Sequence, residues 1–317
     1  MSNALRLYDA QTVDVHRRGI DLEAWLPYFL DDTDVLASTK STYARVIRLF
    51  NRYLSENHIT HPQKADAIAY KDKLLAEGKS ASTIQNYLIG IKQIFKWAVD
   101  KDLYPVDITK GVRNVKITRE HKRDALTMEQ VKKVAQTFDR NTPKGKRNYA
   151  IYALMVTTGA RSIEVVRADI GDIGTFYGEL ALYVQGKGML DKSRALKIAP
   201  QTEDAITDYL SSRGKVDDAA PLFASMSNSN KGKRLTTRSI RGIMKDAFNQ
   251  SIHTTNRVSS HSLRHTFATE NLKAGGSLQE TQHVLGHSSI TTTMNYTHNH
   301  SRQNNHSEAR VANLLLD

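Results

Sequence analysis

The feature that most limits how this chain can fold is an interruption of its apolar patterning between Asp102 and Asp124. The interrupted segment contains Pro105 and Gly111, many charged residues and few large apolar ones, which is typical of a linker. A chain of 317 residues is long enough for two domains of roughly 150 residues each. We therefore expect an N-terminal extension at residues 1–20, a first domain at 21–110, a linker at 111–123 and a second domain at 124–317.

The first domain is predicted to be a helical bundle. Apolar residues recur every three or four positions from residue 43 to residue 54 and form one stripe: Tyr43, Val46, Ile47, Phe50 and Leu54. A shorter helix is expected from Asp66 to Glu77. A third is expected from about Ser82 to Val99, with Ser82 and Gln85 as its capping box.

The second domain is predicted to be mainly helical with a small antiparallel sheet. Thr127 and Gln130 have the spacing of a capping box, and Gly159 is placed to end a buried helix that precedes it. The segments 179–185 and 193–198 alternate as strands do, on either side of Gly186-Lys187-Gly188, which predicts a hairpin. Helical periodicity resumes after Pro200. The predicted fold class is therefore mainly α in both domains.

The charge balance favours a polyanionic partner. The chain has 45 Lys and Arg against 33 Asp and Glu, a formal net charge of +12. Residues 40–119 and 120–317 each carry a net charge of +8, whereas residues 1–39 carry −4. Basic proteins of this kind often bind nucleic acid, because binding releases condensed counterions. A basic enzyme with no such partner is the alternative.

Exposed cations on the first domain are the candidate contacts to such a partner. Three arginines follow one face of the first predicted helix and two lysines lie on the third: Arg45, Arg48, Arg52, Lys92 and Lys96. They form either a solvated face or a phosphate-binding one.

The absence of cysteine excludes several classes of protein. With no cysteines, the chain cannot form disulfides, thiolate zinc sites or a cysteine nucleophile, and this composition fits a reducing cytosol. No apolar run approaches the roughly 20 residues that cross a bilayer, and the N-terminus lacks the apolar stretch of a signal peptide. We expect a cytoplasmic protein with no membrane partner.

Chemically active side chains are concentrated in the C-terminal third. His261 and Arg264 are three residues apart and share one face of a predicted helix. Ser277 and Glu280 are spaced to cap the next helix and Gly286 to end it, which places His287 at a helix–loop junction. Upstream, Arg161 comes shortly after the helix-ending Gly159.

These residue types suit phosphoryl transfer without a metal. Guanidinium groups bind non-bridging phosphate oxygens in pairs and stay charged, so they can neutralise a pentacovalent transition state. Tyr296 is a candidate nucleophile, since histidine and nearby cations can help remove its proton. His261 and His265 have the i, i+4 spacing of a zinc pair, but the chain lacks both the glutamate of that motif and cysteine, so no metal is expected. No P-loop is present, and no cofactor is expected.

Four segments, in this order, resemble the tyrosine recombinase, or phage integrase, family: TGARSIEV from Thr158, the hairpin GKG, HSLRHTFAT from His261, and LGHSSITTTMNYTH from Leu285. The first domain resembles that family's SAM-like core-binding domain, by pattern more than by motif.

The resemblance implies a role for each residue. Tyr296 would attack a DNA phosphodiester and form a 3′-phosphotyrosine link, while Arg161 and Arg264 clamp the phosphate. Lys187 would protonate the leaving 5′-oxygen, although Lys192 lies on the same hairpin. His261 would assist proton transfer from Tyr296, and His287 would hydrogen-bond the phosphate. Glu164 would orient the first arginine.

The same resemblance implies a site-specific recombinase that encloses double-stranded DNA between its two domains. Four copies would act together and exchange C-terminal tails, with accessory DNA-bending or directionality proteins as possible partners and the nucleoid as the location. Integration or excision of a mobile element is the favoured role, and chromosome-dimer resolution or DNA inversion is the alternative. A non-catalytic DNA-binding relative and a histidine-dependent metal nuclease are the competing classes.

Overall fold

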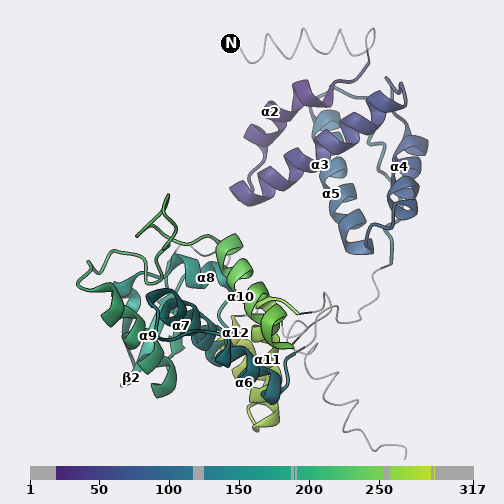
Figure 1. Ribbon diagram of the computed structural model, residues 1–317. Coiled ribbons are helices and arrows are strands. Elements are labelled where there is room, and N and C mark those ends of the chain that lie inside the picture. The colour runs from purple at the N-terminus through teal and green to yellow at the C-terminus, as the bar shows by residue number, and fades with distance from the viewer. Residues whose placement is uncertain are drawn as a thin grey trace, which may run out of the picture. The chain divides into compact units, whose positions relative to one another are not determined.

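The computed structural model describes residues 19–116, 125–186, 189, 191–252, 258–286 and 289. The chain divides into two compact units, residues 1–119 and 120–317. Each unit has its own hydrophobic core. The described helices and the small sheet give the mainly α fold that the sequence predicts (Figure 1). Among the described residues, no helix combines the length and the apolar character needed to cross a membrane.

The first unit is a bundle of four described helices: α2 (Leu22–Asp32), α3 (Ala37–Glu56), α4 (Lys64–Ala76) and α5 (Ala81–Asp100) (Figure 1). Aromatic side chains dominate its core, where Phe50 packs against Tyr70 and Phe95. The expected cap of the last helix is wrong by two residues. Ser80, not Ser82, is the N-cap of α5, and its hydroxyl accepts a hydrogen bond from the Thr83 N–H at 3.2 Å.

The first residues of the expected linker pack on this first core. Val112 and Val115 are partly buried against it. The Gln85 side-chain amide donates to the Val115 carbonyl at 3.0 Å. Residues 117–123, which complete the linker, lie outside the described part of the chain.

The helices of the second unit are α6 (Met128–Gln136), α7 (Pro143–Thr158), α8 (Ser162–Arg167), α9 (Pro200–Arg213), α10 (Thr237–Ile252), α11 (Ser260–Lys273) and α12 (Leu278–Leu285), with a short 3₁₀ turn, η1 (Ile170–Asp172). Helix α7 contacts α6, α8, α9 and α11 and is the centre of the packing. Thr127 caps α6 and Ser277 caps α12 as predicted, each in a capping box.

The sheet has three antiparallel strands in the order β1 (Ile173–Phe176), β2 (Glu179–Val184) and β3 (Arg194–Lys197). The predicted hairpin is β2–β3, in which Leu182 is opposite Leu196 and Val184 is opposite Arg194. The sequence did not predict β1, which pairs Ile173 with Leu182 on the other edge of β2.

Candidate active site

The turn between α7 and α8 positions Arg161. Helix α7 ends at Gly159, whose φ of +66° is left-handed. A Cβ atom at Gly159 would lie 2.7 Å from Leu285 and 2.9 Å from Phe267, so only glycine lets this turn approach α11 and α12. Arg161 follows as the N-cap of α8.

Glu164 is the anion that holds Arg161. Its side chain is fully buried, and its Oε2 atom accepts a hydrogen bond from the Arg161 backbone N–H at 2.8 Å. Its Oε1 atom lies 2.9 Å from Nη1 of Arg161 and 2.6 Å from Nη2 of Arg194. A single buried carboxylate is therefore shared by two guanidinium groups.

Arg264 enters the same region from α11. Its side chain is 1% exposed, although guanidinium groups are rarely buried so completely. It donates hydrogen bonds to the carbonyls of Gly159, at 2.8 Å, and of Leu285. Arg264 thus connects the end of α7 to the end of α12.

Three consecutive carbonyls at the end of α12 each accept a hydrogen bond from a different arginine. Arg194 donates to Val284, Arg264 to Leu285, and Arg161 to Gly286 at 3.2 Å. The carboxyl end of a helix carries partial negative charge and unpaired carbonyls, so cations are stabilised there. We call Arg161, Arg194 and Arg264 the arginine cluster.

The arginine cluster carries more positive charge than its surroundings neutralise. Arginine keeps its charge at any working pH, and Glu164 is the carboxylate that contacts the cluster. The carbonyls of Gly159, Val284, Leu285 and Gly286, which these arginines also contact, carry no net charge, so an anion such as phosphate is attracted to the cluster. The Arg161 side chain is 23% exposed and is the member of the cluster most accessible to such an anion.

Lys192, the second lysine of the hairpin region, contacts two aspartates. The Nζ atom of Lys192 lies 2.7 Å from Asp169 and 2.6 Å from Asp172. Burial lowers the pKa of Lys192, but its hydrogen bonds to Asp169 and Asp172 outweigh this effect, and the net pKa is raised. Lys192 is therefore a poorer proton donor than a lysine without these contacts.

The two histidines of α11 lie next to each other on the helix. The His261 and His265 rings meet edge to face with their centroids 5.4 Å apart. His261 is exposed, whereas Arg264 on the same helix is buried. Within the described residues, no cluster of three or more His, Cys, Asp or Glu side chains is arranged to hold a metal ion.

Three of the predicted site residues, Lys187, His287 and Tyr296, lie outside the described residues. The structure therefore brings together Arg161, Glu164 and Arg264. The chain enters residue 287 directly from Gly286, whose carbonyl contacts Arg161.

The predicted nucleic-acid contacts of the first unit are all exposed: Arg45, Arg48 and Arg52 on α3, and Lys92 and Lys96 on α5. The Arg45 guanidinium lies 5.3 Å from the centre of the Tyr87 ring and donates to its hydroxyl at 3.2 Å. Arg48 pairs with Glu23 at 2.8 Å, which neutralises part of its charge.

Sequence reasoning missed Arg194. A signal was present, because Arg194 and Leu196 of β3 and Ile198, which follows the strand, alternate along the chain and the two apolar residues are buried. An arginine whose side chain lies on the same side of the strand as core residues requires a buried anion as its partner.

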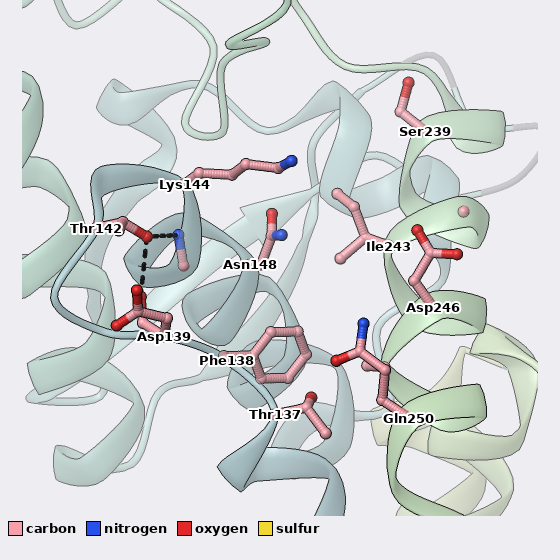
Figure 2. A pocket seen from close by; sticks show the side chains of 13 residues that line it. Thr137, Phe138, Asp139, Thr142, Lys144, Asn148, Ser239, Ile243, Asp246 and Gln250 are labelled. Carbon is pink, nitrogen blue, oxygen red and sulfur yellow. Dashed lines mark hydrogen bonds between the residues drawn. The ribbon is translucent and has the colours of Figure 1, made fainter. Parts of the chain in front are cut away.

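A surface pocket of about 450 Å³ lies elsewhere in the second unit (Figure 2). Lys144 and Asn148 of α7 face Asp246 and Gln250 of α10 across it. None of the arginine cluster lines this pocket, so it is separate from the candidate active site.

Comparison with known proteins places the chain among recombinases. Residues 124–303 match the model of the phage integrase family, and residues 22–102 match that of the phage integrase N-terminal SAM-like domain.

Two curated relatives match over most of their length. Tyrosine recombinase XerD of Mycobacterium tuberculosis is 29% identical over 298 residues, covering 88% of this chain and 92% of the relative. Tyrosine recombinase XerC of Escherichia coli O157:H7 is 29% identical over 285 residues, covering 88% and 91%.

Solved structures share the fold. The XerH site-specific recombinase bound to palindromic difH substrate, in a post-cleavage complex, aligns with a TM-score of 0.69 at 22% identity. That alignment covers 85% of this chain and 79% of XerH. A dimer of lambda integrase residues 75–356 bound to a COC′ core site gives 0.67 at 17% identity, covering 86% of this chain and 97% of that fragment.

Proposed function

Since this chain belongs to the phage integrase family of tyrosine recombinases, we propose that it cuts and rejoins DNA at specific sites through a 3′-phosphotyrosine intermediate. The observation that carries the proposal is the arginine cluster, in which Arg161, the N-cap of α8, and Arg264 of α11 bind adjacent peptide carbonyls, those of Gly286 and Leu285. Two guanidinium groups this close can bind one phosphate together.

Cleavage in the proposed reaction is a single displacement at phosphorus. The Tyr296 oxygen attacks the scissile phosphate, the bond from phosphorus to the 5′-oxygen breaks, and Lys187 gives that oxygen a proton. His261 accepts the proton of Tyr296, and His287 donates a hydrogen bond to the phosphate. The 5′-hydroxyl of a second strand reverses these steps and restores a phosphodiester, so no ATP is consumed.

The arginines stabilise the charge that develops on phosphorus. The hydrogen bond from Arg161 to Gly286 is 3.2 Å long and partly exposed, so a phosphate oxygen can replace the carbonyl as its acceptor. Glu164 keeps the guanidinium in place during this exchange. Preorganised charges of this kind are often the largest contribution to an enzyme's rate.

A DNA substrate nicked close to the attack site tests the chemistry. The nick releases a short strand after cleavage and traps the covalent intermediate. We expect a protein–DNA adduct in excess EDTA and none with Y296F. Binding without an adduct would favour a non-catalytic DNA-binding protein. Cleavage that requires a metal and leaves no adduct would favour a nuclease.

The salt dependence of DNA affinity tests the proposed contacts of the first unit. Each phosphate contact contributes about 0.9 to the slope of log affinity against log salt. If Lys92 and Lys96 both contact phosphates, K92A/K96A lowers that slope by about 1.8. Lys73, whose charge is shared with Glu56 and Glu77, provides the control variant K73A, which leaves the slope unchanged.

The favoured role is integration or excision of a mobile element, with chromosome-dimer resolution or inversion as the alternative. We propose that four copies act on two DNA sites and that the tail, residues 307–317, docks on a neighbouring copy. Accessory DNA-bending proteins are further expected partners, and the nucleoid is the expected location. Deleting residues 311–317 is expected to uncouple cleavage between copies, and unchanged coordination would refute the docking.

Direct repeats or mobile-element genes beside the gene would support the favoured role.

A further inference from the structure

Arg194 connects two parts of the candidate active site that are distant in the sequence. It opens β3, and its side chain is 16% exposed. One of its nitrogens, Nη2, lies 2.6 Å from Oε1 of Glu164 in α8, and the other, Nη1, donates to the Val284 carbonyl at the end of α12.

The first contact couples Arg194 to Arg161. Both guanidinium groups contact the same oxygen of Glu164, so the position of that carboxylate depends on both. Arg194 limits how far Glu164 can turn towards Arg161. The orientation of Arg161 is therefore set in part by a residue of the sheet.

The second contact fixes the end of α12. Gly286 has a left-handed φ of +59°, and a Cβ atom there would lie 3.0 Å from Nε of Arg194 and 3.1 Å from its Cδ. The side chain of Arg194 thus passes over Gly286 in a space that another residue type would fill. Residue 287 comes next in the chain.

From these contacts we infer that Arg194 is a positioning residue, which aligns Arg161 through Glu164 and also holds the chain leading into His287. The inference rests on the proposed function. Arginine is required at this position because its planar group can engage two partners in different directions, whereas lysine presents a single point charge. R194K therefore keeps the charge and loses one of the two contacts.

The matched control is R213K. Arg213 of α9 also donates to main-chain carbonyls, those of Pro221 at 2.7 Å and Leu222 at 3.0 Å, and neither of these residues belongs to the candidate site. R194Q is a second variant in case lysine is not tolerated, since it leaves Glu164 paired with Arg161.

Two measurements on the full-length protein test the inference. In hydrogen exchange without DNA, we expect the amides of residues 282–286 to exchange about ten-fold faster in R194K than in wild type or R213K, with the rest of the unit unchanged. In single-turnover cleavage of the nicked substrate, we expect a loss of about ten-fold or more at saturating DNA, with Kd altered less than about three-fold.

Each outcome decides a separate point. Wild-type cleavage and exchange in both R194K and R194Q would overturn the inference. So would exchange that rises equally across the whole second unit, or equal effects in R213K, because each indicates a general structural role. A wild-type protein that forms no covalent adduct would instead refute the proposed function.

Discussion

At the scale of single residues, the burial of Glu164 makes it the most sensitive acidic side chain of the candidate site. E164Q preserves the shape of the side chain but leaves Arg161 and Arg194 without their shared carboxylate. Breaking a buried ion pair costs about 3–5 kcal/mol, and we expect a loss of this size in the free energy of unfolding of the second unit. Urea unfolding followed by far-UV circular dichroism measures it.

The control for this change is E179Q. Glu179 forms an ion pair with Lys197 on the neighbouring strand, and both side chains are more than half exposed. Exposed pairs contribute about 0–1 kcal/mol, so E179Q is expected to unfold almost as wild type does. Equal losses in the two variants would show that burial of Glu164 has no energetic consequence.

A second prediction at this scale concerns pH. Burial raises the pKa of Asp169, but hydrogen bonds from Lys192 and Arg234 outweigh this, and the net pKa is below its ordinary value of 3.8. A carboxyl group whose pKa is lowered by folding stabilises the folded state at pH values above its ordinary pKa. This stabilisation is lost as the pH falls through the lowered pKa. The raised pKa of Lys192 also stabilises the fold. This stabilisation is fully present below the ordinary pKa of 10.5 and is lost as pH rises through the raised pKa.

K192M removes this pairing, and we expect it to cost about 1–2 kcal/mol of unfolding free energy at neutral pH. The difference from wild type should shrink as pH falls below the ordinary pKa of 3.8 and through the lowered pKa of Asp169, because protonation of that carboxyl weakens the pair in wild type as well. Urea unfolding over this pH range provides the comparison. A difference that stays constant over this range would exclude the ion pair as its cause.

At the scale of elements, Gly159 tests how closely α7, α11 and α12 must approach. G159A combines a left-handed backbone with a Cβ atom 2.7 Å from Leu285, so neighbouring side chains must move. G232A is the control, since Gly232 has a φ of +79° and a Cβ atom there would meet no heavy atom within 4 Å. We expect about 1 kcal/mol of destabilisation for G232A and about 3 kcal/mol for G159A, measured by thermal or urea unfolding. Equal costs would mean that only backbone strain matters at Gly159.

The elements also show why some features could be predicted from the sequence and others could not. The caps at Thr127, Ser277 and Gly159 depend on residues within one turn of the chain, so their spacing identifies them. Ser80 and Ser82 are both suitable caps two residues apart, and local spacing favoured the wrong one. Strand β1 was missed because it is only four residues long and contains Gly174.

The part of the candidate site that could not be predicted from the sequence depends on contacts between residues that are far apart in the chain. Arg161, Glu164 and Arg264 belong to short motifs and were identified as candidates. The partners of Arg194 lie in α8 and α12, and no local spacing connects them to β3. The alternation along β3 could have shown that Arg194 needs a buried partner, but not which residue that partner is.

At the scale of the whole molecule, the two cores predict two separate unfolding transitions. Both tryptophans, Trp25 and Trp97, are buried in the first unit, so tryptophan fluorescence reports on that unit, whereas far-UV circular dichroism follows both. Ile94 is fully buried in the first core and Leu263 in the second. Truncating either to alanine is expected to cost about 2–5 kcal/mol.

We expect I94A to move the fluorescence transition to lower urea concentration and L263A to leave it in place, because no residue of one core belongs to the other. L263A should instead move only part of the circular dichroism transition. Wild-type protein should already show different midpoints with the two probes, or separable slopes, since the units differ in size. If L263A moves the fluorescence transition as far as I94A does, the two units unfold as one, and contacts between them must then contribute several kcal/mol of coupling.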